Sequence, residues 1–345
     1  MCDMGRRVVV IGGGVAGMEA AGQLARRGCN VTVFEKETET GGHVKNWFHL
    51  FPDRKDSRDV LRYLGNKINH NNITLFTGIA VEGIRPSNGS FSVFTGDGNE
   101  ITADAVVVAT GFDLFRSEKK EEYGYGIYEN VITSADLERM FRKDQIRMHD
   151  GSIPGKIGLV HCVGSRDEKA GNLYCSKLCC VTAVKQAMEI AEHMEDAKVF
   201  CFYMDMRMGG AMYEELYREA QENYGIGFIR GKVSEVAQNI DNKLIVKVED
   251  TLTGRPLKME IDLLVLMAGM EMSEGGKKIA QSAGLDTGEN RFFKPADLHF
   301  ASNESNIKGV FYAGTCTMPM NITEAISHAR AAAADVMDYL DSRTD

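Results

Sequence analysis

The stretch from residue 7 to residue 35 constrains the fold of this 345-residue chain most strongly. An apolar segment, Arg7–Ile11, runs into Gly12-Gly13-Gly14-Val15-Ala16-Gly17, which has the form G-x-G-x-x-G. We expect this segment to be a buried strand, Met18–Arg27 to be an amphipathic helix, and residues 31–34 to be a second strand that ends before Glu35. Strand, glycines, helix, strand and acid in this order predict a dinucleotide-binding βαβ unit.

Each residue type of this motif has a chemical role. Gly12 permits the tight turn, Gly14 lets backbone approach a pyrophosphate, and Gly17 lets the helix pack on the strand. The phosphate charge would meet free N–H groups at the helix N-terminus. Glu35 would accept hydrogen bonds from ribose hydroxyls. The alternative is a glycine turn of a Rossmann-like fold that holds no ligand.

Three later segments favour FAD over NAD. They are Gly41-Gly42-His43, the AVVVATG run of residues 105–111, and the GVFYAG run of residues 309–314, which precedes a helix. They resemble the two-dinucleotide flavoproteins, thioredoxin reductase-like in layout, in which the last strand and helix cover the isoalloxazine. The resemblance implies an α/β fold with two dinucleotide-binding domains. Thr315 departs from it, because such proteins usually place Asp there to bind the ribitol, although a hydroxyl can still hydrogen-bond.

The residues expected to contact FAD come from these segments and their neighbours. They are Gly12, Gly14, Ala16, Gly17, Glu35, Lys36, Gly42, His43, Val44, Val81, Ala109, Thr110, Gly111, Gly314, Thr315, Ile322 and Thr323.

Residues 73–101 alternate apolar and polar side chains around Asn88-Gly89 and Asp97-Gly98. This pattern predicts a small antiparallel meander, the usual insertion in an FAD domain. We therefore expect a discontinuous FAD domain, residues 1–115 and 271–345, and a second domain of residues 116–270.

Four of the eight cysteines gather in the second domain, at Cys162, Cys175, Cys179 and Cys180, with the spacing C-x12-C-x3-C-C. They follow an expected strand at 156–163 and precede a helix from Val181 and a strand at 198–203, which keeps a βαβ frame. The loop has no G-x-G-x-x-G, so we expect this domain not to bind NAD(P) in the usual way. Four thiolates are the standard ligand set of a [4Fe-4S] cluster.

Other interpretations of these cysteines remain open. Zinc is one, although adjacent cysteines are unlike the usual zinc spacing, and buried free cysteine is another. Cys175 and Cys180 also have the C-x4-C spacing of a redox disulfide, so a dithiol oxidoreductase is the competing enzyme class. The side chains of Cys179 and Cys180 point about 100° apart on a helix, so we expect the segment to coil.

The remaining cysteines, Cys2, Cys29, Cys201 and Cys316, are expected to be ordinary thiols, with Cys201 in an apolar strand of the core. The role of Cys316 is open because it lies beside the flavin-facing turn.

Composition excludes some functions. The net charge of −9 argues against nucleic acid, which rewards clustered Lys and Arg. No apolar run approaches the ~20 residues that a bilayer-spanning helix needs, so no membrane insertion is expected. Clustered cysteines indicate metal or redox work in a reducing compartment, which predicts a cytoplasmic protein.

The segment VHCVGSRDEKAGNLYCSKLCCVTAVKQA resembles the signature of the A subunit of heterodisulfide reductase. YENVITSADLER before it and YEELYREAQENYGIGFIRGKVSEV after it resemble the same family, and the resemblance covers nearly the whole chain. It implies FAD at the N-terminal glycines and the C-terminal helix. It also implies an inserted [4Fe-4S] cluster at the four cysteines.

The resemblance further implies an electron-transfer subunit of a cytoplasmic complex in sulfur-compound redox metabolism. The expected partners are iron–sulfur subunits similar to heterodisulfide reductase B and C, together with a second copy of the chain in a homodimer. The extra N-terminal region and ferredoxin part of the methanogen subunits are not among these residues. We therefore expect the short form found in sulfur-oxidising complexes, or the related subunit of a quinone-linked complex of sulfate reducers.

Overall fold

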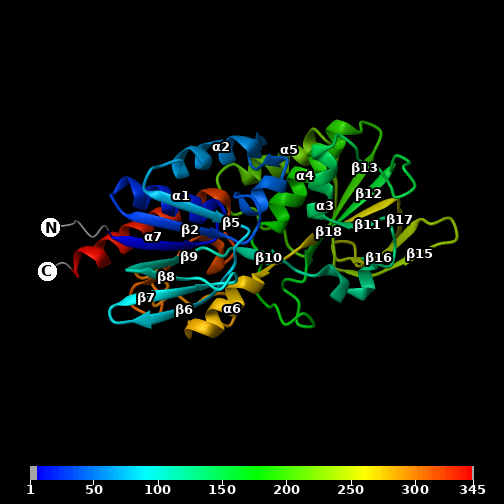
Figure 1. The fold of residues 1–345 in the computed structure, drawn as a ribbon. Coiled ribbons are helices and arrows are strands. Elements are labelled where there is room, and N and C mark those ends of the chain that lie inside the picture. The colour runs from blue at the N-terminus through cyan, green and yellow to red at the C-terminus, as the bar shows by residue number, and fades with distance from the viewer. Residues whose placement is uncertain (1–5, 344–345) are drawn as a thin grey trace. The chain divides into compact units, whose positions relative to one another are not determined.

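The computed structural model describes residues 6–343, which form two compact units (Figure 1). Unit 1 comprises residues 6–45, 57–113 and 271–343, and unit 2 comprises residues 46–56 and 114–270. The short strands β10 (Phe112–Leu114) and β19 (Met270–Met272) lie where the chain passes between the units. Within the described residues, no helix is both long enough and apolar enough to cross a membrane.

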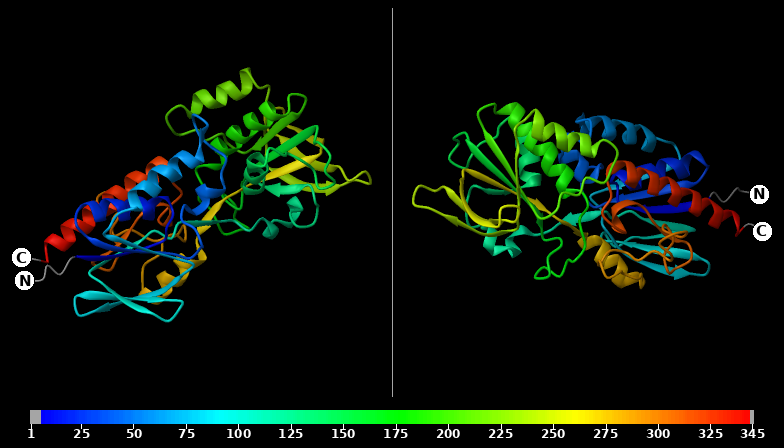
Figure 2. Two further views of the ribbon diagram at one scale, coloured as in Figure 1. Left: turned by 45° about the horizontal axis from the view of Figure 1, so that its top comes forward. Right: turned by 180° about the vertical axis from the view of Figure 1, so that it is seen from behind.

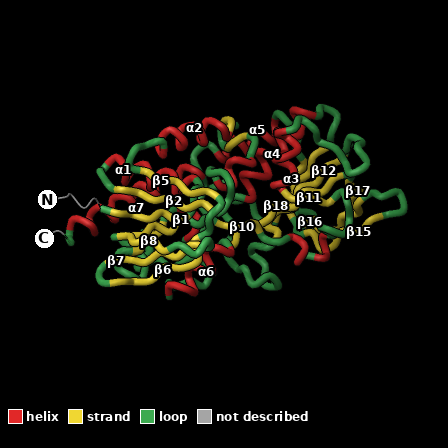
Figure 3. The backbone as a smooth tube through the Cα atoms, in the orientation of Figure 1, coloured by secondary structure: helices red, strands yellow, loops and turns green. Residues whose placement is uncertain are grey.

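A five-stranded parallel sheet forms the centre of unit 1 (Figure 3), with the order β20-β9-β1-β2-β5. Its strands are β1 (Arg7–Ile11), β2 (Asn30–Glu35), β5 (Ile73–Thr77), β9 (Ala105–Val108) and β20 (Val310–Tyr312). Ile11 pairs with both Phe34 and Val108, so the ends of these strands meet at one edge of the sheet. Such an edge is where open α/β sheets bind ligands.

Three helices complete the core of unit 1: α1 (Val15–Arg26), α2 (Ser57–Ile68) and α7 (Ile322–Asp341). Helix α1 packs against α2 and α7, and Figure 2 shows α1 in blue beside α7 in red. Alanines dominate the contact, because Ala20, Ala21 and Ala329 are fully buried with no side chain to hold the helices apart. The short helices η1 (Gly42–Asn46) and η4 (Gly314–Cys316) lie near this core in sequence.

The meander predicted for residues 73–101 is correct only from residue 81. Residues 73–77 form β5, which pairs in parallel with β2 at the edge of the main sheet. The antiparallel meander consists of β6 (Val81–Ser87), β7 (Ser90–Thr95) and β8 (Glu100–Ala103), with α6 (Glu274–Ala283) packed on β6. Asn88 and Gly89 both have positive φ, which suits a tight two-residue hairpin.

Unit 2 repeats the same plan with a five-stranded parallel sheet of order β11-β18-β12-β13-β14. The strands are β11 (Val131–Thr133), β12 (Lys156–Val163), β13 (Lys198–Tyr203), β14 (Gly227–Arg230) and β18 (Leu263–Ala268). The helices are α3 (Ser134–Arg142), α4 (Cys179–His193) and α5 (Tyr213–Glu222), besides the short η2 (Ser117–Lys119) and η3 (Glu121–Tyr123). An antiparallel sheet holds β15 (Val233–Gln238), β16 (Leu244–Asp250) and β17 (Arg255–Ile261).

Residues 46–56 were expected in the FAD domain, whereas in the structure they belong to unit 2. They form a small hairpin of β3 (His49–Leu50) and β4 (Lys55–Asp56). The backbone N–H of Phe48 donates to Glu138 on α3, and Lys185 on α4 donates to the backbone oxygen of His49. These long-range hydrogen bonds attach the hairpin to unit 2 and have no local sequence signal.

Candidate functional site

The glycines after β1 shape a loop that a larger residue could not form. A Cβ on Gly12, which has φ of 110°, would lie 2.4 Å from the Ala109 backbone oxygen. A Cβ on Gly17 would lie 1.8 Å from the Gly12 oxygen. At Gly14, by contrast, the nearest atom is the Cα of Gly42 at 3.9 Å. Gly12 and Gly17 are therefore required by packing, and Gly14 leaves open space where a ligand can approach the backbone.

Helix α1 begins directly after this loop and has no side-chain cap at Gly14, so its first N–H groups are available to an anion. Glu35, at the end of β2, is 6% exposed. One of its carboxylate oxygens accepts from the backbone N–H of Gly13 at 2.7 Å and the other from that of Glu37 at 2.9 Å. Each oxygen keeps a lone pair that a ribose hydroxyl can use.

Two further predicted segments of unit 1 contain polar groups beside small residues. The His43 Nε2 atom lies 2.8 Å from the Phe112 oxygen, and the two rings stack at 4.4 Å. The hydroxyl of Thr110 is buried and makes no hydrogen bond within the described residues. A Cβ on Gly111 would lie 3.7 Å from the Thr315 hydroxyl, so these two predicted residues are neighbours.

The start of α7 also forms as predicted. Gly314 approaches α1 closely, because its Cβ would lie 2.5 Å from that of Ala16. Asn321 caps α7: its side chain accepts from the Glu324 N–H at 2.8 Å, and Glu324 accepts from the Asn321 N–H at 3.0 Å. Ile322 and Thr323 are thereby fixed in the first turn. Sequence analysis missed His328, whose Nδ1 accepts from the Gly314 N–H at 2.9 Å.

The other predicted FAD contacts have mixed environments. Val44, Val81 and Ala109 are buried, while Lys36 is exposed and lies 3.9 Å from Glu37.

In unit 2 the four clustered cysteines lie at the carboxyl end of β12 and the start of α4. Cys162 has φ of 59° beside an irregularity in the pairing of β12 with β18. Cys179 and Cys180 open α4, two residues earlier than predicted, so they lie on a helix rather than in a coil. Cys175 lies in the preceding loop and is partly exposed, and its sulfur accepts from the Lys177 N–H at 3.3 Å.

Three of these thiols interact with one another. The sulfur atoms of Cys162 and Cys179 are 3.6 Å apart, and the Cys180 sulfur is 3.6 Å from the Asp205 backbone oxygen. Hydrogen bonds from Cys179 lower the pKa of Cys162 and of Cys180, whereas the pKa of Cys179 is raised. One thiol that keeps its proton between two that readily lose theirs is a soft, electron-rich donor set.

An ion-paired carboxylate lies next to this donor set. Asp205 follows β13, the position at which a nucleotide-binding domain carries its ribose-binding acid. Here Arg166 pairs with Asp205 at 2.6 Å, and Arg230 lies 3.4 Å from it. Sequence analysis did not identify these three residues, which belong to separate loops and show no motif.

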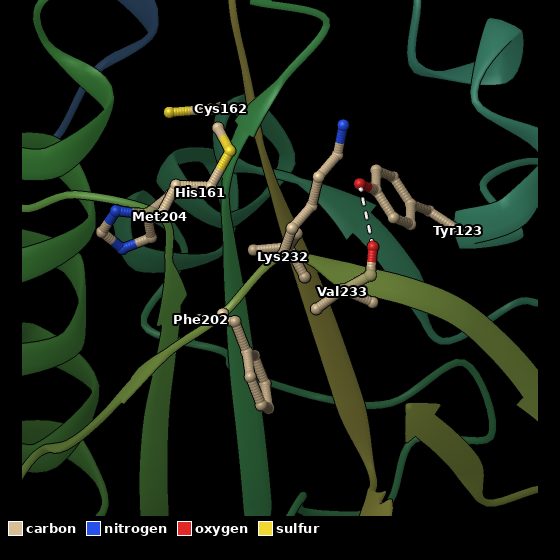
Figure 4. A pocket seen from close by; sticks show the side chains of 9 residues that line it. Tyr123, His161, Cys162, Phe202, Met204, Lys232 and Val233 are labelled. Carbon is tan, nitrogen blue, oxygen red and sulfur yellow. Dashed lines mark hydrogen bonds between the residues drawn. The ribbon is translucent and has the colours of Figure 1, made fainter. Parts of the chain in front are cut away.

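A small hollow adjoins Cys162 (Figure 4), with a volume of about 10 Å³, or room for about one water molecule. Tyr123, His161, Phe202 and Lys232 are among its lining residues. His161 is 6% exposed, and neither of its ring nitrogens makes a hydrogen bond within the described residues. The ring nevertheless contributes to the lowered pKa of Cys180.

Within residues 6–343 no group of three or more His, Cys, Asp or Glu side chains is arranged to hold a metal ion. The described cysteines are all free thiols, and Cys29, Cys201 and Cys316 are buried, as ordinary core thiols would be. Cys2 lies outside the described residues. The four clustered cysteines thus match an iron–sulfur cluster in the chemistry of their donors, and only Cys162, Cys179 and Cys180 lie in mutual contact.

A family model described as "Pyridine nucleotide-disulphide oxidoreductase" matches residues 3–126. Solved structures with the same fold include thioredoxin reductase of Lactococcus lactis, with a TM-score of 0.70 and 19% identity over 98% of this chain and 99% of that one. The thioredoxin reductase of T. acidophilum has a TM-score of 0.68 and 20% identity over 98% and 99% of the two chains. The predicted α/β fold of a two-dinucleotide-binding flavoprotein is therefore confirmed.

Curated relatives are named as heterodisulfide reductase A subunits. The A subunit of the H(2)/formate:CoB-CoM heterodisulfide,ferredoxin reductase of Methanococcus maripaludis is 31% identical over 97% of this chain and 64% of its own length. The A subunit of the H(2):CoB-CoM heterodisulfide,ferredoxin reductase of Methanothermobacter thermautotrophicus is 39% identical over 68% of this chain and 37% of its own length. The chain thus spans less than two thirds of the length of these relatives.

Proposed function

The chain is a relative of the heterodisulfide reductase A subunits over almost its whole length, and from this premise we propose that it is an FAD-dependent electron-transfer oxidoreductase. One observation carries the proposal. Unit 1 keeps the nucleotide-binding glycines, while unit 2 keeps the βαβ frame and places Cys162 and α4's Cys179 and Cys180 where the second glycine loop would be. A flavin unit joined to a thiolate unit suits the relay of electrons.

The residues of unit 1 fit FAD. Gly14 and the uncapped N-terminus of α1 would hold the pyrophosphate, and Glu35 would hold the ribose. The unpartnered Thr110 hydroxyl and its neighbour Thr315 would supply hydrogen bonds to the flavin. The bound flavin would accept or donate two electrons, and the protein residues would orient it and exclude water.

The clustered cysteines fit a [4Fe-4S] cluster by donor type, since four thiolates are its standard ligands. We propose Cys162, Cys175, Cys179 and Cys180 as the ligands. The guanidinium of Arg166 would offset part of their negative charge. Such a cluster exchanges one electron at a time.

The finer parts of the proposal rest on the named relatives. We propose partner iron–sulfur subunits similar to heterodisulfide reductase B and C, a cytoplasmic location, a homodimer, and a role in sulfur-compound redox metabolism. Membership of a quinone-linked complex is the alternative within the same relay function. Co-purification of the native protein with such iron–sulfur subunits tests the assembly, and recovery of a free protein that turns over small disulfides at an ordinary enzymatic rate would reject it.

Anaerobic reconstitution tests the cofactors directly. We expect bound flavin and about four irons per chain, the content of one [4Fe-4S] cluster, with a low-temperature EPR signal after reduction. Cys179→Ala should lose the iron and the signal while it keeps the flavin. Cys201→Ala is the matched control, because Cys201 is equally buried in unit 2 but lies in the interior of β13. Equal iron content in the two variants would contradict the ligand assignment.

A dithiol oxidoreductase is the second candidate, and the 3.6 Å contact between the sulfurs of Cys162 and Cys179 favours it. This pair differs from the C-x4-C pair of Cys175 and Cys180 that the sequence indicates. An iron-free protein that keeps full redox activity, and loses it in Cys162→Ala, would establish the dithiol enzyme and remove the cluster.

A further inference from the structure

Helix α4 buries a cluster of ionisable side chains well away from its cysteines. Lys185 is 2% exposed, Glu189 is 1% exposed, and Glu138 of the neighbouring α3 is 4% exposed. Lys185 Nζ lies 2.5 Å from Glu138 and 3.3 Å from Glu189. His49 of β3 completes the cluster, with its Nδ1 atom 2.9 Å from Glu189. Charged groups are rarely buried this fully unless they are paired.

The two carboxylates are not equally well supported. Glu138 accepts hydrogen bonds from Lys185, from the Gln186 amide at 2.7 Å and from the Phe48 N–H at 2.8 Å. Glu189 has His49 on one oxygen, while its other oxygen is buried without a hydrogen bond. A carboxylate with several donors stays ionised, and one without them favours the neutral acid. Glu189 is therefore the carboxyl group of the cluster that takes up a proton.

Charge counting gives the same result. With His49 neutral, Lys185 contributes +1 and the two glutamates −2, which leaves one uncompensated negative charge in a buried site. One proton removes that charge and its desolvation cost. Burial raises the pKa of Glu189 to about 7, and burial lowers the pKa of His49, so the carboxyl group holds the proton.

The other charged groups near the pair lie on the hairpin of residues 46–56 and farther along α4. Arg54 opposes the rise in the pKa of Glu189, whereas Asp56 favours protonation of His49. His193, one turn beyond Glu189, has its Nδ1 atom on the Glu189 backbone oxygen, and its ring lies 3.6 Å from Asp144. The His49 side chain is 30% exposed, so it connects buried Glu189 with solvent.

We propose that Glu189 and His49 form a proton-binding site, which takes one proton from solvent when the redox centre at the start of α4 accepts an electron. This coupling rests on the proposed function. The proton passes to the Glu189 carboxylate through His49, the electron comes from the reduced flavin or an added one-electron reductant, and no covalent bond other than O–H forms.

The geometry of α4 sets the strength of the coupling. Cys180 and Glu189 are nine positions apart on one helix, which corresponds to about 13 Å of rise. At an effective dielectric constant near 20, one added negative charge at that distance raises the Glu189 pKa by roughly one unit. A shift of this size is large enough to measure.

Infrared spectroscopy of protein labelled with ¹³C at the glutamate carboxyl groups tests the site. We expect a protonated-carboxyl band that titrates near neutral pH in the oxidised protein and about one pH unit higher after reduction by dithionite, the shift derived above. Glu189→Gln should abolish the band. Glu192→Gln, an exposed position on the same helix, should keep it.

His49→Leu provides a second variant that does not depend on how Glu189→Gln folds. Loss of the imidazole removes a partner of the carboxylate and should raise the midpoint of the band. A wild-type protein without a neutral-range band, or a band that survives Glu189→Gln, would overturn the site. A band that does not move although flavin and iron are present and reduced would overturn the coupling. Absence of any reducible centre would instead reject the proposed function, and the oxidised-state titration would still decide the site.

Discussion

The sulfur atoms of Cys162 and Cys179 lie 3.6 Å apart, although the residues are 17 positions apart in the sequence. The left-handed backbone of Cys162 turns it out of the regular strand, and α4 begins at Cys179. The end of a strand and the start of the next helix thus meet at the carboxyl edge of the sheet. A phosphate-binding loop would occupy this place in a nucleotide domain.

This contact predicts which disulfide forms in metal-free protein. The thiol-specific oxidant diamide should link Cys162 to Cys179, because their sulfurs need only a small rotation to reach bonding geometry. Peptide mass spectrometry identifies the link, and Cys201, fully buried in β13, serves as an internal thiol that should stay free. Loading with iron and sulfide should protect the pair. A dominant link between Cys175 and Cys180 would contradict the prediction and restore the sequence-based dithiol.

Local patterns explain what sequence analysis predicted well. The order of β1, glycine loop, α1 and β2 depends on neighbouring residues, and each element is present within three residues of its expected bounds. The main error there is the start of α1, at Val15 rather than Met18. The glycine loop enters the helix directly, and the apolar periodicity used to find the helix cannot register that first turn.

Long-range contacts explain the rest. Residues 73–77 alternate like a meander strand, yet they pair in parallel with β2, a partner about 40 positions away. Lys185 and Glu189 would be placed on a surface by composition, and their partners Glu138 and His49 are up to 140 positions away. Burial of such groups depends on a complete network, which no local window contains.

Two glycines of the nucleotide loop should respond differently to alanine. Gly17→Ala should destabilise unit 1, because its Cβ would overlap the Gly12 oxygen at 1.8 Å. Gly14→Ala should leave the fold intact, since nothing lies closer than 3.9 Å, but should reduce flavin affinity by at least tenfold, about 1.4 kcal/mol. Thermal denaturation and the flavin content of the purified variants separate the two effects. A Gly14→Ala protein with full flavin content would show that the ligand does not approach this position.

The buried Glu19 should be the strongest electrostatic contributor to unit 1. It accepts from Lys67 at 2.6 Å and from Arg330 at 2.7 Å. Glu19→Ala leaves buried Lys67 unpaired and should cost about 3–5 kcal/mol of unfolding free energy, against less than about 0.5 kcal/mol for the exposed Glu37→Ala. Urea denaturation measures both.

The pH dependence of this effect follows from its sign. The hydrogen bonds to Arg330 and Lys67 lower the folded-state pKa of Glu19 below its ordinary 4.5, despite the opposing effect of burial. The stabilisation is therefore complete above pH 4.5 and is lost as the pH falls through the folded-state value. Wild type and Glu19→Ala should converge in acid, and a difference that is independent of pH would attribute the loss to packing alone.

Pyridine nucleotides should be poor electron donors to this protein. The loop after β12 presents cysteines in place of a glycine cradle, and the acid that would bind a ribose, Asp205, is paired with Arg166 and Arg230. Anaerobic mixing with NADH or NADPH should leave the flavin absorbance largely unchanged over seconds, while dithionite should bleach it. Rapid bleaching by NADH with micromolar affinity would place a nucleotide site in unit 2 after all. A flavin that resists dithionite as well would point to a purely structural cofactor, because electron transfer requires that the flavin be reducible.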